Sequence, residues 1–117
     1  MTEIHVFRHA ADALTIEPGE QLFREGDPGD VMFAVLEGEV ELRVGGTVVE
    51  SVGPGGILGE LALIDSAPRS ATATATTPTR VVRVDAERFN YLVNEHPTFA
   101  LQVMTVMAER LRRSNGR

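Results

Sequence analysis

Short apolar runs recur along residues 14–85, and Gly, Pro or Asp interrupts them every several residues. The interruptions fall at residues 17–19, 26–30, 38, 45–46, 53–56 and 77–78. Short strands joined by tight turns produce this spacing, which is typical of an all-β sandwich or barrel. We therefore expect a mainly β fold for most of the chain.

Three segments predict two individual strands and one hairpin turn. Val40, Leu42 and Val44 alternate with polar residues, which predicts a strand with one face in the core and one in water. Residues 31–36 are apolar without alternation, as expected for a strand buried on both faces. The pair at 45–46 is Gly-Gly, which supplies the positive φ angles of a tight hairpin.

The pattern becomes helical after Asp85. Asp85 suits the N-cap of a first helix, and Pro97 suits the first turn of a second helix that ends near Arg113. The second helix carries apolar residues at helical spacing, which are Ala100, Val103, Met104, Met107 and Leu111. We expect this stripe to pack on the sheet, with a dimer seam as the alternative.

The length of 117 residues fits a single domain with one core. We expect this domain to span residues 1–117, with a β-roll over about 11–85 and C-terminal helices over about 86–113.

Composition and charge exclude several functions. The chain has no Cys, so thiolate catalysis, iron–sulfur clusters and Cys-based zinc sites are excluded. Its net charge of −6 argues against direct nucleic acid binding, which needs clustered positive charge. No apolar run approaches the roughly 20 residues that span a bilayer, so no membrane association is expected. Acidic Glu3 stands where a signal peptide is basic, which favours a cytoplasmic location.

An enzyme is not expected. The chain has three His residues, His5, His9 and His96, and none lies on a candidate strand, where a metal-binding jelly roll would need its ligands. His5 and His9 can share a face if their segment is helical, but a third ligand is missing. No Ser, His and Asp arrangement stands out, so we predict no catalytic residue and no metal site.

The segment 59–72, GELALIDSAPRSAT, carries the strongest functional signal in the chain. It places Glu60 and Arg69 nine residues apart, with Gly59 to permit a sharp turn and Pro68 to fix the backbone before the arginine. A carboxylate accepts a charge-assisted hydrogen bond from a hydroxyl, and a guanidinium donates two parallel bonds to a phosphate. The two side chains either pair with each other or face a third group that offers both a hydroxyl and a negative charge.

The segment resembles the phosphate-binding cassette of the cyclic-nucleotide-binding domain family. This family includes catabolite activator proteins and the regulatory subunits of cyclic-AMP-dependent kinase. The matching residues are 59–63 and 68–72. Upstream, 23–30, Phe33, Val35, Gly38 and Val40 are similar to the family's early strand and turn signature, and downstream Phe89, Arg110 and Leu111 are similar to its closing helices. The resemblance covers nearly the whole chain. It implies an eight-stranded β jelly-roll or barrel with a short cassette helix and two C-terminal helices.

The resemblance also implies a ligand, cyclic AMP or cyclic GMP, and no other cofactor. The ligand-binding residues would be Gly59, Glu60, Leu61, Ala62, Arg69, Ser70, Ala71 and Thr72. Glu60 suits the ribose 2′-hydroxyl and Arg69 the phosphate. Leu61 and Ala62 would open a helical turn whose unpaired N–H groups point at the anion. Ser70 would donate to the phosphate or the base. The bacterial look of the sequence favours cyclic AMP.

In the family, the C-terminal helix closes toward the sheet when the nucleotide binds. By resemblance, the helix over about 98–113 is the output element, with Leu111 or a neighbour capping the base and a protein effector or second copy as partner. The Arg residues at 110, 112, 113 and 117 are interpreted as cations favoured at a helix C-terminus. Two alternatives remain. One is a degenerate domain that serves as an interaction or scaffold module, and the other is the sensor fragment of a transcription regulator.

Overall fold

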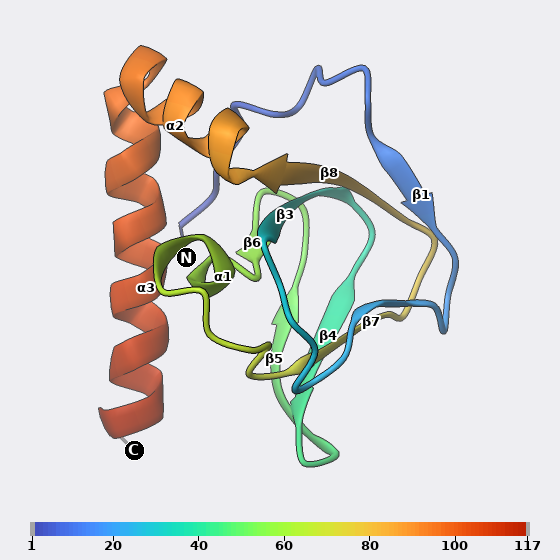
Figure 1. Cartoon of the computed structure of the whole chain (residues 1–117). Coiled ribbons are helices and arrows are strands. Elements are labelled where there is room, and N and C mark those ends of the chain that lie inside the picture. The colour runs from blue at the N-terminus through green and yellow to red at the C-terminus, as the bar shows by residue number, and fades with distance from the viewer. Residues whose placement is uncertain (1, 117) are drawn as a thin grey trace.

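The strands form two antiparallel four-stranded sheets that pack face to face (Figure 1). One sheet has the order β1 (Leu14–Ile16), β8 (Thr79–Asp85), β3 (Val31–Glu37) and β6 (Ile57–Leu58). The other has the order β2 (Gln21–Phe23), β7 (Thr72–Ala75), β4 (Val40–Val44) and β5 (Thr47–Val52). The computed structural model describes residues 2–116. The predicted mainly β fold is confirmed, as an open jelly-roll-like sandwich rather than a closed barrel.

Strand β3 is buried on both faces, as its unbroken apolar run predicts. Val31, Phe33 and Val35 belong to the core between the two sheets, whereas Met32 and Ala34 belong to a second core beneath the helices. Alternate side chains of a strand point to opposite faces, so one apolar run serves both cores. β3 therefore holds the helices and the sandwich together.

The predicted Gly-Gly hairpin joins β4 to β5. Val44 is paired with Thr47, and Gly45 and Gly46 both have positive φ, at 57° and 84°. Leu42 is buried, but Val44 is 42% exposed because it lies at the hairpin end, beyond the cover of the other sheet.

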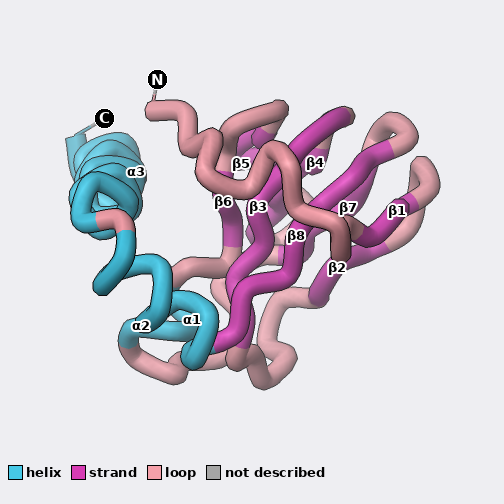
Figure 2. Tube along the Cα trace, turned by 90° about the horizontal axis from the view of Figure 1, so that it is seen from above, coloured by secondary structure: helices cyan, strands magenta, loops and turns pink. Residues whose placement is uncertain are grey.

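Three helices lie together on one side of the sandwich (Figure 2). They are α1 (Leu61–Ile64), α2 (Ala86–Glu95) and α3 (Pro97–Gly116). Asp85 caps α2 as predicted, because its Oδ1 accepts a hydrogen bond of 2.9 Å from the Arg88 N–H. None of the helices in the described part of the chain is long and apolar enough to cross a membrane.

The apolar side chains of α3 occupy two faces, so the single stripe predicted for this helix is wrong. Val103 is buried in the core beneath the helices, and Met107 packs against that core. Met104 and Leu111 are 57% and 63% exposed and point away from it. A period of 3.6 residues marks apolar positions along a helix but cannot say which of two opposite faces meets the sheet.

An aromatic cluster joins α3 to α2 and to the N-terminal arm. The Phe99 ring is 1% exposed and lies edge-on to two others, with centroids 5.7 Å from Phe7 and 5.6 Å from Phe89. The arm itself is irregular with turns, so His5 and His9 do not share a helical face. Phe99 is thus the main anchor of α3 in the core.

Candidate ligand-binding site

The cassette 59–72 runs from the end of β6 through α1 to the first residue of β7, between the sandwich and α3 (Figure 1). Gly59 has a φ of +75°, which matches the sharp turn predicted there. Glu60 and Arg69 are only 4% and 8% exposed. Charged side chains are rarely buried to this degree without partners, so their surroundings indicate what the site does.

The backbone of Arg69 is held by the loop between β2 and β3. The Arg69 N–H donates to the Asp27 carbonyl and the Arg69 carbonyl accepts from the Gly26 N–H, each at 2.8 Å. The Thr72 hydroxyl oxygen accepts from the Glu25 N–H at 2.9 Å. The segment 23–30, which the sequence linked to the cassette only by resemblance, is therefore its direct support.

The Arg69 side chain fills a narrow slot. Its Cζ lies 4.2 Å from the centroid of the Phe23 ring, which is a cation–π distance. On another side, a Cβ added at Gly29 would lie 2.3 Å from Arg69 Nε. Nη1 donates to the Gly59 carbonyl at 3.3 Å, but the buried Nε has no hydrogen-bond partner within residues 2–116. The slot fixes the guanidinium while leaving one buried donor unsatisfied.

Burial lowers the pKa of Arg69 below its usual value, and the nearby charges of Asp30 and Asp27 offset only part of that effect. A guanidinium stays protonated in spite of such a shift, so Arg69 is a buried cation that forms no ion pair with any described residue. An anion that accepts from Nε would satisfy both the donor and the charge.

Glu60 pairs with Arg110 on α3, which was not among the predicted ligand-binding residues. Arg110 Nη1 donates to Glu60 Oε1 at 2.6 Å, and the other nitrogens of Arg110 donate to both carboxylate oxygens of Glu50 at 2.9 and 3.1 Å. No ion pair joins Glu60 to Arg69 in the part of the chain that is described. The two cassette charges are therefore held apart.

The interpretation of the arginines near the end of α3 needs correction. Arg110 and Arg113 do not only offset the helix dipole, because both form ion pairs with Glu50 on β5. Arg117 lies outside the described residues. Nothing in the sequence beyond the presence of charge indicates this cluster, because Arg110 is 50 residues from Glu60 and 60 residues from Glu50.

The other predicted site residues differ in what they present. Ala62 is buried, and its N–H donates to the Gly59 carbonyl at 3.2 Å. The prediction that this N–H is unpaired is therefore wrong. Leu61 is 42% exposed at the first position of α1. Ser70 is exposed beside Arg69, Ala71 is buried in the core between the sheets, and Thr72 supports Glu25.

Substitution of Gly29 tests the slot without removing any charge. In Gly29→Ala the new methyl group would overlap the guanidinium, so Arg69 must leave its position. We expect the affinity for a cyclic nucleotide to fall at least about tenfold, because one charge-assisted hydrogen bond contributes about 1.5–3 kcal/mol. Isothermal titration calorimetry measures this. Gly53→Ala is the matched control, since an added Cβ there meets nothing closer than 3.7 Å. Equal affinities of the two variants would contradict the claim that ligand binding needs Arg69 in its slot beside Gly29.

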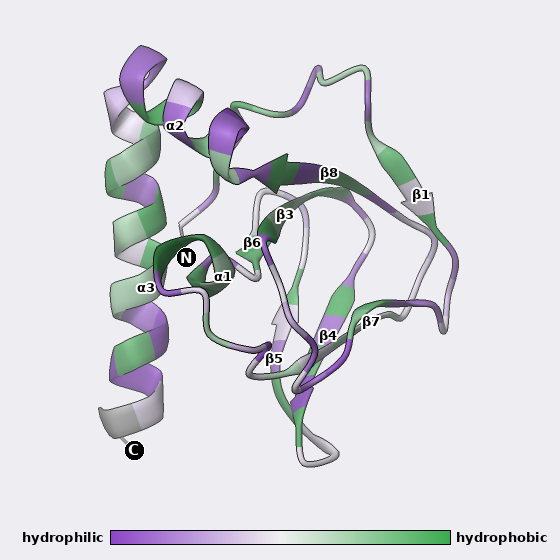
Figure 3. Ribbon diagram, viewed as in Figure 1, coloured by the Kyte–Doolittle hydropathy of each residue, from purple (hydrophilic) through white to green (hydrophobic). Residues whose placement is uncertain are grey.

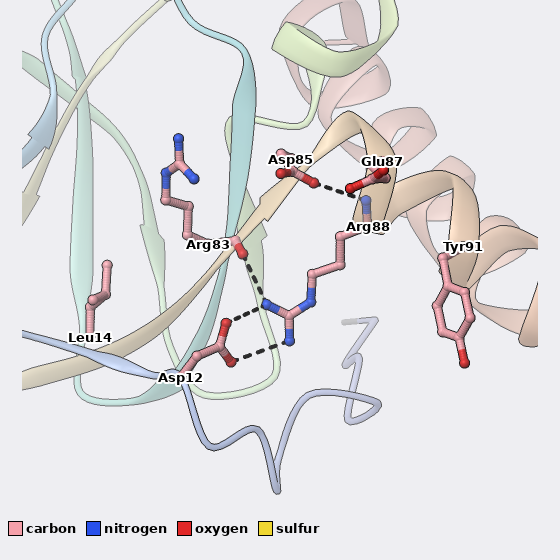
Figure 4. A pocket seen from close by; sticks show the side chains of 7 residues that line it. All are labelled: Asp12, Leu14, Arg83, Asp85, Glu87, Arg88 and Tyr91. Carbon is pink, nitrogen blue, oxygen red and sulfur yellow. Dashed lines mark hydrogen bonds and ion pairs between the residues drawn. The ribbon is translucent and has the colours of Figure 1, made fainter.

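A separate groove of about 700 Å³ lies between the N-terminal arm, β8 and α2 (Figure 4). Arg88 crosses it and forms two hydrogen bonds to Asp12, at 2.6 and 3.3 Å, and one of 3.2 Å to the Arg83 carbonyl. These bonds tie the arm to α2, and the hydrogen bond from Arg88 lowers the pKa of Asp12. The groove is a structural junction and contains no cassette residue.

The two sheets, the flanking helices and the charged cassette together define the class of protein as a β-roll domain. The chain belongs to the cyclic nucleotide-binding domain family, whose model matches residues 13–96. This confirms the resemblance drawn from the cassette.

Three similar proteins illustrate the family. The CRP-like cAMP-activated global transcriptional regulator of Mycobacterium tuberculosis is 31% identical over 103 residues, which are 84% of this chain and 46% of that protein. The catabolite activator protein of Thermus thermophilus has a TM-score of 0.79 at 29% identity, over 89% of this chain and 51% of that one. A structure from a cyclic-GMP-dependent signalling pathway that regulates bacterial phytopathogenesis has a TM-score of 0.76 at 29% identity. The match covers 86% of this chain and 84% of that one. The chain spans less than half the length of the curated relative.

Proposed function

We propose that this domain binds a cyclic nucleotide monophosphate, with cyclic AMP favoured over cyclic GMP, and acts as a sensor or regulatory domain without catalytic activity. The observation that carries the proposal is Arg69, a buried guanidinium with an unsatisfied Nε. A phosphodiester supplies the acceptor oxygens and the single negative charge that this group lacks. Membership of the family supports the same ligand class.

The proposed contacts follow from the positions of the side chains. The phosphate accepts from Arg69, and the ribose 2′-hydroxyl donates to Glu60, whose Oε2 receives no hydrogen bond from any described residue. The N–H groups of Leu61 and Ser70 are the backbone donors proposed for the phosphate, and Ala62 contributes through packing. Gly59, Ala71 and Thr72 are proposed to contribute through their backbone.

The choice of cyclic AMP is supported by the named ligand of the mycobacterial relative, while the phytopathogenesis structure keeps cyclic GMP as the second candidate. A thermal-shift panel with cyclic AMP, cyclic GMP and linear AMP tests the class and the base together. We expect the melting temperature to rise with a cyclic nucleotide, cyclic AMP most, and to stay constant with linear AMP. Constant melting with all three would favour a scaffold domain of the same fold.

Helix α3 is the proposed output element, because Arg110 joins it to cassette residue Glu60. Leu111, which was predicted with its neighbours as a cap over the base, is 63% exposed here. We expect amide hydrogen exchange in α3 to slow when cyclic AMP is added, since the ligand holds the cassette to which the helix is bonded. Exchange that is unchanged throughout α3 would contradict this output.

The outward face of α3 is the proposed partner surface, which a second copy of the chain would cover. Leu101, Met104, Ala108 and Leu111 follow one another at intervals of three, four and three residues, the spacing of a coiled-coil seam. Leu101, Met104 and Leu111 are 62%, 57% and 63% exposed. Figure 3 shows apolar residues along this helix. Sedimentation velocity distinguishes a dimer from a monomer that needs a separate effector.

We further propose a cytoplasmic location and no direct nucleic acid binding, in line with the net charge of −6.

A further inference from the structure

Glu25 connects the cassette to the hairpin between β4 and β5. Its backbone N–H donates to the Thr72 hydroxyl oxygen at 2.9 Å, and its carboxylate Oε1 accepts from the Gly45 N–H at 3.0 Å. Thr72 ends the cassette, and Gly45 begins the two-residue turn of the hairpin. These partners lie 47 and 20 residues from Glu25, so one residue joins two segments that are distant in the sequence.

The loop that contains Glu25 also holds Arg69. The Gly26 N–H donates to the Arg69 carbonyl, and the Asp27 carbonyl accepts from the Arg69 N–H, each at 2.8 Å. Gly29, in the same loop, lies against the guanidinium, since a Cβ added there would overlap Arg69. An anion that fixes the Arg69 side chain therefore also restricts the loop and, with it, Glu25.

The turn of the hairpin has little packing of its own. Val44, Val48 and Val49 are 42%, 44% and 48% exposed, and a Cβ added at Gly45 or Gly46 meets no atom within 4 Å. Among residues 2–116, the carboxylate of Glu25 provides the one hydrogen bond that reaches this turn from outside the hairpin. Segments with few buried contacts open at low free energy, so this bond has a large influence on the order of the turn.

We propose that the hairpin over residues 43–49 is a second element that responds to the ligand, and that Glu25 is the positioning residue that couples it to Arg69. The coupling runs through the loop, the cassette and the hairpin, and so bypasses α3. It is reciprocal, because a ligand that orders the hairpin binds more tightly when the hairpin is already ordered. This inference rests on the proposed binding of a cyclic nucleotide.

The test measures water exchange of the Gly45 amide by NMR, with and without saturating cyclic AMP. In the unchanged protein we expect cyclic AMP to slow this exchange at least about threefold. In Glu25→Ala the exchange is expected to be fast and to be the same with and without ligand. The affinity for cyclic AMP is expected to fall by about the same factor, as reciprocity requires. A purely structural bond would change the rate of exchange but not its dependence on ligand.

Glu20→Ala is the matched control. Glu20 is also an exposed glutamate whose carboxylate accepts from a backbone N–H, that of Glu17 at 2.7 Å, so the variant removes the same charge and the same kind of bond. Its affinity and the ligand dependence of Gly45 exchange are expected to stay within about 1.5-fold of the unchanged protein. Glu25→Gln is expected to retain most of the ligand dependence, because its amide oxygen can still accept from Gly45.

The outcomes separate this inference from the proposed function. If the unchanged protein binds no cyclic nucleotide, the proposed function fails and this inference fails with it. If cyclic AMP binds but leaves Gly45 exchange unchanged, the coupling is overturned while the proposed function stands. If Glu25→Ala responds to ligand as fully as the unchanged protein, the role of Glu25 is overturned. If Glu25→Ala does not fold, Thr72→Val decides, because it removes the hydroxyl to which the Glu25 N–H donates. A reduced ligand dependence in Thr72→Val supports the coupling, and a full one overturns it.

Discussion

Substitution of Arg69 by alanine is expected to weaken cyclic nucleotide binding at least tenfold while the domain stays folded. A hydrogen bond to a charged group contributes about 1.5–3 kcal/mol, and the guanidinium offers the phosphate more than one donor. The loss is therefore expected to lie between about tenfold and several hundredfold, at about 1.4 kcal/mol for each tenfold change. Titration with cyclic AMP measures it.

The fold should tolerate this change because burying the Arg69 charge without a ligand lowers the free energy of unfolding. Alanine removes a desolvated charge and an unsatisfied Nε, which offsets the lost contact with the Phe23 ring. We expect the melting temperature of the free protein to change by less than about 5 °C. Arg80→Ala, which removes an exposed arginine paired with Glu37, should leave affinity unchanged. Unchanged affinity in Arg69→Ala would place the phosphate elsewhere.

Substitution of Phe99 by alanine is expected to have the largest effect on stability. The ring is 1% exposed and contacts Phe7 and Phe89, so its removal leaves a cavity where α3, α2 and the N-terminal arm meet. Deletion of a buried Phe side chain costs about 3–5 kcal/mol, a large part of the roughly 5–15 kcal/mol that stabilises a typical domain. Urea denaturation followed by circular dichroism measures the free energy of unfolding.

Tyr91→Ala is the matched control for Phe99→Ala. Tyr91 is an aromatic residue on α2 with 62% exposure, and its loss is expected to change the free energy of unfolding by less than about 1 kcal/mol. If Phe99→Ala were equally mild, α3 would not be anchored through this ring. The ion pair between Arg110 and Glu60 would then be the main contact that connects the cassette to α3.

Features that depend on neighbouring residues could be predicted from the sequence. The Gly-Gly hairpin, the Asp85 cap and the double burial of β3 each follow from a few consecutive side chains, whose conformational preferences are local. The cassette was also found from its sequence, because Gly59, Glu60 and Arg69 lie in one short segment. Its ligand contacts stay a prediction.

Features that depend on packing between distant segments could not be predicted. Glu60 and Arg110 are 50 residues apart, and nothing in either local sequence marks the other as a partner. The slot around Arg69 needs Phe23 and Gly29 from a different loop. The two apolar faces of α3 have the same helical period, so only the tertiary structure shows that Val103 faces the core and Met104 faces outward.

Arg69 and Glu60 are proposed to hold one cyclic nucleotide together. Isothermal titration of the purified chain with cyclic AMP, cyclic GMP and linear AMP tests it most directly. We expect one cyclic nucleotide to bind per chain, with a Kd of about 10 µM or tighter for a ligand of this size, and linear AMP not to bind. Absence of binding heat from both cyclic nucleotides at about 1 mM ligand, where even weak sites fill, would contradict it.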